Sequence, residues 1–325
     1  MLNTERLASS QGLGDDIPES LQQRVGRLYA RQRLGMERDQ EADVAAQEVK
    51  LLRMESAPSA HLAIRAAVVM SGLYRRGLRN SARVELSHNH IDSPRLPPSF
   101  DGVTILQLSD LHVDMSADAM ERVVQLVEEV AYDLCVLTGD YRARILGPLD
   151  SILAGVARVR ASITGTMYAV LGNYDSLRMV PAFEQMGIRT LLNECETIER
   201  GDQRIHLAGI DDAHFFRLDN ITKAAAAIPH DEFSILISHT PEIYRQAAHA
   251  GFKVLIAGHT HGGQICLPGG IPMKLGAALP RSMGAGSWSY RGMAGYTSRG
   301  AGSSVVPVRF NCPPEITLHH LRRSP

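Results

Sequence analysis

Short apolar runs at similar distances along the chain are the feature that most restricts its fold. Six of them follow residue 102, at 104–108, 134–138, 167–171, 205–208, 234–237 and 254–257. Each has the length of a buried β-strand, and a helical pattern with apolar residues on one face, at 117–131, lies between the first two. Strands that alternate with helices indicate an α/β sheet with helices packed against it.

The chain before these runs has a different pattern, which predicts an N-terminal helical extension. Residues 17–54 are rich in Arg, Gln, Glu, Ala and Leu, which favour helix. A second helix is expected over 61–78. The segment 93–98 contains three prolines, which exclude helix and central strand and so predict a linker. We therefore divide the chain into a helical extension with its linker, residues 1–98, and a main domain, residues 99–325.

Polar side chains follow five of the six apolar runs, at the point where each strand would leave the sheet. They are carboxylate, carboxamide and imidazole groups beside Gly or Ser, in Ser109-Asp110-Leu111-His112, Gly139-Asp140, Gly172-Asn173-Tyr174-Asp175, Ser238-His239 and Gly258-His259-Thr260-His261. In open α/β sheets, ligands bind outside the carboxyl ends of the strands. Each residue alone has an ordinary explanation, such as a hydrogen-bonded histidine or an Asp that caps a helix. Their coincidence at five strand ends favours a metal site.

Seven of these residues are candidate metal ligands, namely Asp110, His112, Asp140, Asn173, His239, His259 and His261. Oxygen and imidazole donors without thiolate suit Mn, Fe, Zn or Co better than Ca or Mg. Seven ligands are too many for one open catalytic site, but they suit two divalent ions about 3.5–4 Å apart that share a carboxylate. Such ion pairs hold the attacking and leaving oxygens of a displacement at phosphorus. The set therefore predicts a hydrolase that acts on phosphoric ester or anhydride bonds.

The combined motif resembles that of the calcineurin-like metallophosphoesterase superfamily. The resemblance covers residues 102–318, and within it 258–264 and 298–316 resemble the bacterial branch with YkuE-like and YaeI-like phosphoesterases. It implies a sandwich of two mixed β-sheets flanked by helices. By the same resemblance, a first metal takes Asp110, His112, Asp140 and His261, and a second takes Asp140, Asn173, His239 and His259. A hydroxide that bridges the two metals then attacks phosphorus.

The candidate catalytic residues are Asp140, Asn173, Tyr174 and Asp175, of which Asp175 is expected to orient its neighbours. The family usually has His after the Asn of this motif, and this chain has Tyr174. A phenol with an ordinary pKa near about 10 is a weaker proton donor at neutral pH than the imidazole it replaces. One hypothesis is slow hydrolysis of alkyl phosphate esters, by roughly 10²-fold or more. The other is a substrate with a good leaving group, such as a phosphoanhydride.

The UDP-2,3-diacylglucosamine hydrolases of the superfamily also replace this His, and they cleave a pyrophosphate. A lipid-linked pyrophosphate is therefore one specific substrate hypothesis, beside a phosphorylated small molecule. A non-catalytic scaffold with this fold is the rival to an enzyme, although such scaffolds are expected to lose metal ligands.

Charge and hydropathy limit the partners. The formal net charge is −1, which predicts no nucleic-acid partner. No secretory signal is visible and the four cysteines form no CxxC pair, so we expect a cytoplasmic protein. The apolar segment 66–74 is too short to cross a membrane. Together with the arginines around it, residues 61–83 are either a core-packing helix with a basic end or a peripheral membrane contact.

Three further features lie outside the five strand-end motifs. Residues 284–302 are dense in glycine and serine, which predicts a loop that acts as a lid or substrate rim. The cluster His88-Asn89-His90 has no strand-end carboxylate beside it and is interpreted as solvated. Asp211 and Asp212 follow a strand-like run, so either they support the metal site or they are structural.

Overall fold

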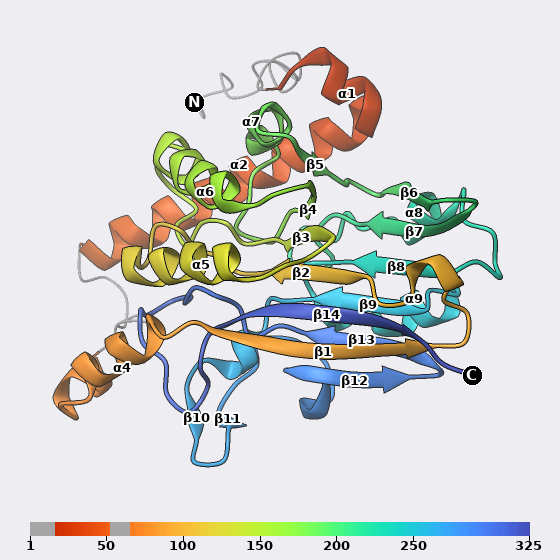
Figure 1. Cartoon of the computed structure of the whole chain (residues 1–325). Coiled ribbons are helices and arrows are strands. Elements are labelled where there is room, and N and C mark those ends of the chain that lie inside the picture. Colours follow the sequence, from red (N-terminus) through yellow and green to blue (C-terminus); the bar gives the residue numbers. More distant parts are fainter. Residues whose placement is uncertain (1–16, 53–65) are drawn as a thin grey trace, which may run out of the picture.

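The computed structural model describes residues 17–52 and 66–325, and its centre is a sandwich of two six-stranded β-sheets (Figure 1). The first sheet contains, in spatial order, β1 (Glu85–Ser93), β14 (Glu315–Arg323), β2 (Thr104–Leu108), β3 (Leu134–Thr138), β4 (Thr166–Val170) and β5 (Ile188–Thr190). The second contains β12 (Gly286–Tyr290), β13 (Met293–Thr297), β9 (Val254–Ala257), β8 (Ser234–Ile237), β7 (Gln203–Gly209) and β6 (Glu194–Arg200). Each sheet combines parallel and antiparallel pairs, so the predicted sandwich of two mixed sheets is confirmed.

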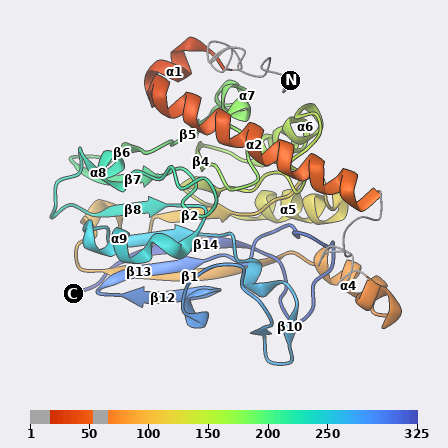
Figure 2. The ribbon, with the colours of Figure 1, turned by 180° about the vertical axis from the view of Figure 1, so that it is seen from behind.

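Helices cover the outer faces of both sheets (Figure 2). The first sheet is covered by α1 (Glu19–Val25), α2 (Arg27–Leu52), α5 (Ala117–Glu129), α6 (Asp150–Ser162) and α7 (Val180–Gln185). The second is covered by α8 (Ile221–Ala225) and α9 (Tyr244–His249). Helix α4 (Tyr74–Ser81) and the hairpin of β10 (Cys266–Leu267) and β11 (Ile271–Pro272) project from one end of the molecule in both views.

Three apolar clusters hold these four layers together. Ile105, Val136 and Ile256 belong to the cluster between the two sheets. Their strand neighbours point outward, Leu106 toward the helices on the first sheet and Leu255 toward those on the second. Successive side chains of a strand point to opposite faces, so a strand covered on both faces is a near-continuous apolar run. This burial explains why the central strands were visible in the sequence.

The six predicted strands are present as β2, β3, β4, β7, β8 and β9, with small shifts at the ends of β4 and β7. The loop predicted over 284–302 is wrong, because β12 and β13 form a hairpin there and β13 pairs with β9. Along β12, Trp288 and Tyr290 alternate with exposed serines, and both rings pack against Tyr244. This alternation has the period of a half-buried strand, which the glycine and serine content obscured.

The helix predicted over 17–54 is present as α1 and α2, which are separated at Gly26 (φ 101°). Its last residues, 53 and 54, lie outside the described part of the chain. Of the helix predicted over 61–78, residues 61–65 also lie outside the described part. The residues that follow are helical at 66–70 and again in α4, with a break at Gly72 (φ 71°).

The division of the chain at residue 99 stays a prediction. Strand β1 lies before that position and pairs with β14 in parallel from Glu85 to Ser93. A paired strand belongs to the sheet that it extends, so we propose that the main domain begins at β1 and that α1 and α2 form the extension.

Candidate metal centre

The seven predicted ligands lie at the carboxyl ends of strands from both sheets. In the first sheet, Asp110 and His112 follow β2, Asp140 follows β3 and Asn173 follows β4; in the second, His239 follows β8, and His259 and His261 follow β9. The side chains of Asp110, His112 and His239 are inaccessible to solvent, with 0% exposure. The structure therefore brings residues from five separate strands into one buried cluster.

Five of these residues have a left-handed backbone. The φ angles are 51° at Asp110, 40° at His112, 56° at Asp140, 70° at His259 and 50° at His261. Asp and His tolerate this conformation better than most residues, but it still costs of order 1–3 kcal/mol at each position. The turns that it produces point the side chains of neighbouring strand ends at one another. Backbone conformations of this kind gather at functional sites.

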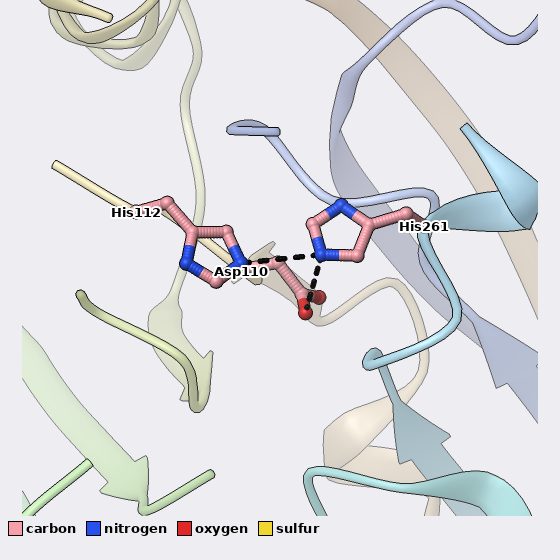
Figure 3. A group of neighbouring side chains, drawn as sticks. All are labelled: Asp110, His112 and His261. Atoms are coloured by element: carbon pink, nitrogen blue, oxygen red, sulfur yellow. Dashed lines mark hydrogen bonds and ion pairs between the residues drawn. The ribbon is translucent and has the colours of Figure 1, made fainter. Parts of the chain in front are cut away.

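The first group of ligands consists of Asp110, His112 and His261. The Nε2 atoms of His112 and His261 are 3.2 Å apart, and Nε2 of His261 is 3.4 Å from Oδ1 of Asp110. Figure 3 shows the two imidazole nitrogens facing each other beside the carboxylate. One ion can contact all three side chains here, because their ligand atoms lie within 4.8 Å of one another.

The second group consists of Asp140, His239 and His259, with Asn173 beside them. Nε2 of His239 lies 3.4 Å from Oδ2 of Asp140, 3.0 Å from Oδ1 of Asn173 and 3.1 Å from Nδ1 of His259. The same Oδ2 of Asp140 is 3.9 Å from Nε2 of His112 in the first group. The Asp140 carboxylate is therefore placed between the two groups.

Two of the imidazoles form a hydrogen bond on the side of the ring that points away from the site. This bond determines which ring nitrogen carries the proton, and so which nitrogen is available as a metal ligand. Nδ1 of His112 is 2.8 Å from the carbonyl of Arg142, and Nδ1 of His239 is 2.9 Å from that of Thr138. A carbonyl only accepts, so Nδ1 of both rings carries a proton, and each ring in its neutral form presents the Nε2 lone pair to the site. His259 presents Nδ1 instead, and its buried Nε2 has no hydrogen-bond partner among the residues that the structure describes. These donors fit divalent ions that bind both imidazole and carboxylate.

Without a cation, a proton on His239 balances the charge of Asp140. Burial lowers the pKa of His239, but the adjacent Asp140 carboxylate outweighs it and raises this pKa to about 10. Burial raises the pKa of Asp140, and His239 in turn holds it well below its usual range. The pKa of His259 falls to about 3 because of burial and the neighbouring His239 and His214. An ion bound here would displace the proton of His239, since metal ligands must be deprotonated.

Asp175 lies behind the ligands and contributes to neither group. Its buried carboxylate accepts hydrogen bonds from the backbone N–H groups of Asp140 (2.7 Å), Tyr141 (2.8 Å) and Gly172 (2.8 Å). It therefore ties the turn after β3 to the turn after β4, and with them the ligands that both turns carry.

Tyr174 lies at the edge of the first group. Its backbone N–H donates to Oδ1 of Asp140 (3.0 Å), and its ring meets that of His112 edge-on with the centroids 5.8 Å apart. Burial and the negative charge of Asp140 raise the pKa of the phenol. A hydrogen bond with Ser304 opposes this shift in the pKa without cancelling it. The phenol is therefore protonated at neutral pH and can donate a hydrogen bond.

Several residues around the site were missed in the sequence. His214 packs on His259 with ring centroids 4.2 Å apart, and its Nδ1 is 2.6 Å from Oε2 of Glu242. The guanidinium of Arg309 is fully buried, with Nη2 3.1 Å from Nδ1 of His261. None of these residues lies in a strand-end glycine cluster, so no local pattern assigned them to the metal site.

Asp211 and Asp212, for which the sequence allowed either a role in supporting the metal site or a structural role, lie outside both groups of ligands. Oδ2 of Asp212 accepts from the backbone N–H groups of Phe215 and Phe216, both at 2.7 Å. Asp211 is fully buried, and its Oδ2 accepts a hydrogen bond from Tyr29 of α2 (2.6 Å). Both therefore have structural partners in this part of the molecule.

Comparison with known proteins agrees with this geometry. The profile of the family described as calcineurin-like phosphoesterase matches residues 103–263, a range that includes all seven ligands. Residues 103–263 form a calcineurin-like phosphoesterase domain. The predicted resemblance to this family is confirmed. Together with the two groups of ligands, this match supports a metal-dependent phosphoesterase.

Sequence similarity to individual relatives extends beyond the range of the family profile and covers most of the chain. The uncharacterized metallophosphoesterase YkoQ of Bacillus subtilis (strain 168) is 29% identical over 270 residues, which cover 80% of this chain and 98% of YkoQ. YkuE of the same organism is 25% identical over 256 residues, which cover 74% of this chain and 86% of YkuE. A transmembrane protein with metallophosphoesterase domain from Bos taurus is 27% identical over 287 residues, 81% of this chain and 62% of that protein. Within residues 17–52 and 66–325 of this chain, no helix has the length and apolarity of a membrane span.

Proposed function

We propose that this chain hydrolyses a phosphodiester or a phosphoanhydride with two divalent ions of Mn, Fe, Zn or Co. The position of Asp140 carries the proposal, because its Oδ2 reaches histidines of both groups, at 3.4 Å from His239 and 3.9 Å from His112. One ion would be held by Asp110, His112 and His261, the other by Asn173, His239 and His259, and Asp140 would be shared. Two such ions would lower the pKa of a bound water and would stabilise negative charge on the phosphoryl oxygens.

The environment of Tyr174 supports a substrate with a good leaving group. Its phenol has a raised pKa, so it donates a hydrogen bond but gives up a proton less readily than an imidazolium would. An alkoxide leaving group needs that proton, whereas a phosphate or nitrophenolate does not. We therefore expect phosphoanhydrides and activated diesters to be hydrolysed faster than alkyl monoesters.

The test is a substrate panel with the purified chain in Mn or Zn. We expect hydrolysis of bis-p-nitrophenyl phosphate and of ATP, with a smaller kcat/KM for an alkyl monoester. The Asp140→Asn variant should lose more than the roughly 10–100-fold that is typical of residues that only support a ligand. Absence of hydrolysis by the unmodified chain with every metal in the panel would refute the proposal.

The rival scaffold function makes a different prediction about metal content. A scaffold would have no need for buried carboxylates and imidazoles at five strand ends, where Asp110, His112 and His239 are excluded from solvent. Elemental analysis after equilibration with Mn distinguishes the two functions, since we expect two ions per chain and a scaffold would retain none.

Exposed apolar side chains beside arginines support a lipid-linked pyrophosphate as a second candidate substrate. Met70 and Leu73 are 81% and 44% exposed next to α4, and on the hairpin Leu267 and Met273 are 51% and 64% exposed. The exposed arginines of this region are Arg75, Arg76 and Arg79. Exposed apolar side chains can insert into the surface of a membrane while neighbouring arginines contact its anionic headgroups. Part of the predicted contact over 61–83 lies outside the described residues, so the proposal rests on the residues from 66 onward.

Vesicle co-sedimentation tests this membrane contact. We expect the chain to bind phosphatidylglycerol vesicles more tightly than phosphatidylcholine vesicles, and the double variant Met70→Glu, Leu73→Glu to bind less. Leu28 on α2 is 70% exposed and far from this region along the chain, so Leu28→Glu is the matched control. Equal binding by the double variant and the control would contradict a contact through residues 66–83.

A further inference from the structure

Helix α2 buries polar side chains where a helix that only packs would bury apolar ones. Arg33, Glu37 and Gln40 are 0%, 1% and 8% exposed, and their spacing places them on one face of the helix. This face lies against the segment that follows β4, and Figure 2 shows α2 running across this side of the molecule. Buried charges cost several kcal/mol each unless they are paired, so their presence requires an explanation.

The three side chains hold the loop that carries the metal ligand Asn173. Gln40 Nε2 donates to the carbonyl of Asn173 itself (3.1 Å), and Arg33 Nη2 donates to that of Asp175 (3.1 Å). Glu37 accepts from the hydroxyl of Ser176 (2.6 Å) and from the N–H of Leu177 (2.8 Å). The loop from 173 to 177 is thus fixed by four hydrogen bonds from one helix.

A buried network fixes the helix in turn. The Arg33 guanidinium stacks on the Phe216 ring at 3.3 Å, and its Nε is 3.1 Å from Oδ2 of Asp211. Tyr29 donates to the same carboxylate oxygen of Asp211. Asp211 follows β7 of the second sheet, so α2 connects a strand end of that sheet to the ligand loop of the first.

We propose that Arg33, Glu37 and Gln40 are positioning residues for the second metal ion, and that α2 is required to complete its site. The inference rests on the proposed function. Stability alone does not explain the polar face, because replacing buried ion pairs by apolar residues of similar volume is often neutral or stabilising. Asp110, His112 and His261 come from other loops and receive none of these hydrogen bonds. Loss of the contacts should therefore weaken the second ion and spare the first.

Stepwise Mn titration with measurement of bound ions per chain is the test. We expect Gln40→Ala to weaken the second ion about 10-fold and Glu37→Ala to weaken it about 10- to 100-fold, the range for residues that support a ligand from behind. The first ion should keep its affinity in both variants. Gln32→Ala is the matched control, because Gln32 is an exposed glutamine on the same helix.

Electron paramagnetic resonance gives a second readout. The coupled two-manganese signal should be lost in Glu37→Ala at a metal concentration that saturates the unmodified chain, and the signal of a single ion should remain. Equal weakening of both ions, or an unchanged second ion in Gln40→Ala and Glu37→Ala, would overturn the positioning role. If the unmodified chain binds two ions but hydrolyses no phosphate compound, the proposed function fails while the binding data still decide this inference.

Discussion

The close approach of two strand ends makes Gly172→Ala a direct test of the candidate site. A Cβ atom added at Gly172 would lie 2.2 Å from Oδ1 and 2.6 Å from the backbone N of Asp140. Contacts below 3.0 Å are essentially absent from real structures. The φ angle of Gly172 is not positive, so alanine meets no backbone strain and the whole effect comes from this contact.

The magnitude follows from how little Asp140 can move. Relief of the contact requires a shift of about 1 Å in Asp140, the order of displacement that costs roughly 10²-fold in rate when it misplaces a reacting group. Its Oδ1 already accepts from the N–H of Tyr174 (3.0 Å), and its Oδ2 lies 3.4 Å from His239. We therefore expect kcat/KM for an activated diester to fall about 100-fold and stability to fall by about 1–3 kcal/mol, as for other overpacked cores.

The assay compares Gly172→Ala with Gly35→Ala for kcat/KM, bound metal and urea unfolding. An added Cβ at Gly35 of α2 has no neighbour within 4 Å in the described part of the chain, so this control should keep its activity and gain about 0.5–1 kcal/mol in stability. An unchanged kcat/KM and two bound ions in Gly172→Ala would refute the reasoning, because Asp140 would then not be the shared ligand.

Three further predictions concern other parts of the site. Tyr174→His restores an imidazole beside His112, so monoester hydrolysis should rise at neutral pH by roughly 10²-fold with little gain on pyrophosphates; equal gains on both would contradict the leaving-group hypothesis. In Asp175→Asn, an NH₂ group replaces one carboxylate oxygen, so at least one buried backbone N–H faces another donor. Urea unfolding should show that the free energy of unfolding falls by about 2–4 kcal/mol, and the exposed control Asp202→Asn should show no such loss. Burial raises the pKa of Glu242, but the hydrogen bond from its histidine partner outweighs this and lowers it from 4.5 to about 2. Because this folded-state pKa is depressed, up to about 3 kcal/mol of stability is present above pH 4.5 and lost as the pH falls toward 2; acid unfolding of Glu242→Gln should lack this component.

The ligand cluster could be predicted because its information is local in the sequence. Each ligand directly follows an apolar run that is buried on both faces, and parallel strands bring their carboxyl ends to the same edge. At Gly258, a Cβ would lie 1.9 Å from Oγ of Ser109 and 2.5 Å from Oδ2 of Asp110. The glycines that mark the strand ends in the sequence are thus the positions where two of these turns touch.

The polar face of α2 could not be predicted, because its partners are distant in the sequence. Charged and polar residues at helical spacing, such as Arg33, Glu37 and Gln40, usually form a solvated face. Their burial depends on the loop after Asn173 and on Asp211, which the chain reaches more than a hundred residues later. Arg309 lies in the segment 298–316 that carries part of the family resemblance, but its place at the site could not be predicted for the same reason. It bonds to backbone carbonyls such as that of Gly302, a type of partner that no side-chain motif records.

Each group of ligands spans the two sheets, and this arrangement links the core of the sandwich to the chemistry. The first group takes Asp110 and His112 from the first sheet and His261 from the second, and the second group takes Asp140 from the first sheet and His239 from the second. The distances within each group are therefore set by the apolar cluster between the sheets rather than by either sheet alone. A bound ion would cross-link the sheets at their carboxyl ends, where α2 already joins the loop after β4 to the loop after β7. The helix and the ions thus both act on the distance between the two sheets at this edge. For this reason a contact on α2, outside both groups, can change the affinity of one ion.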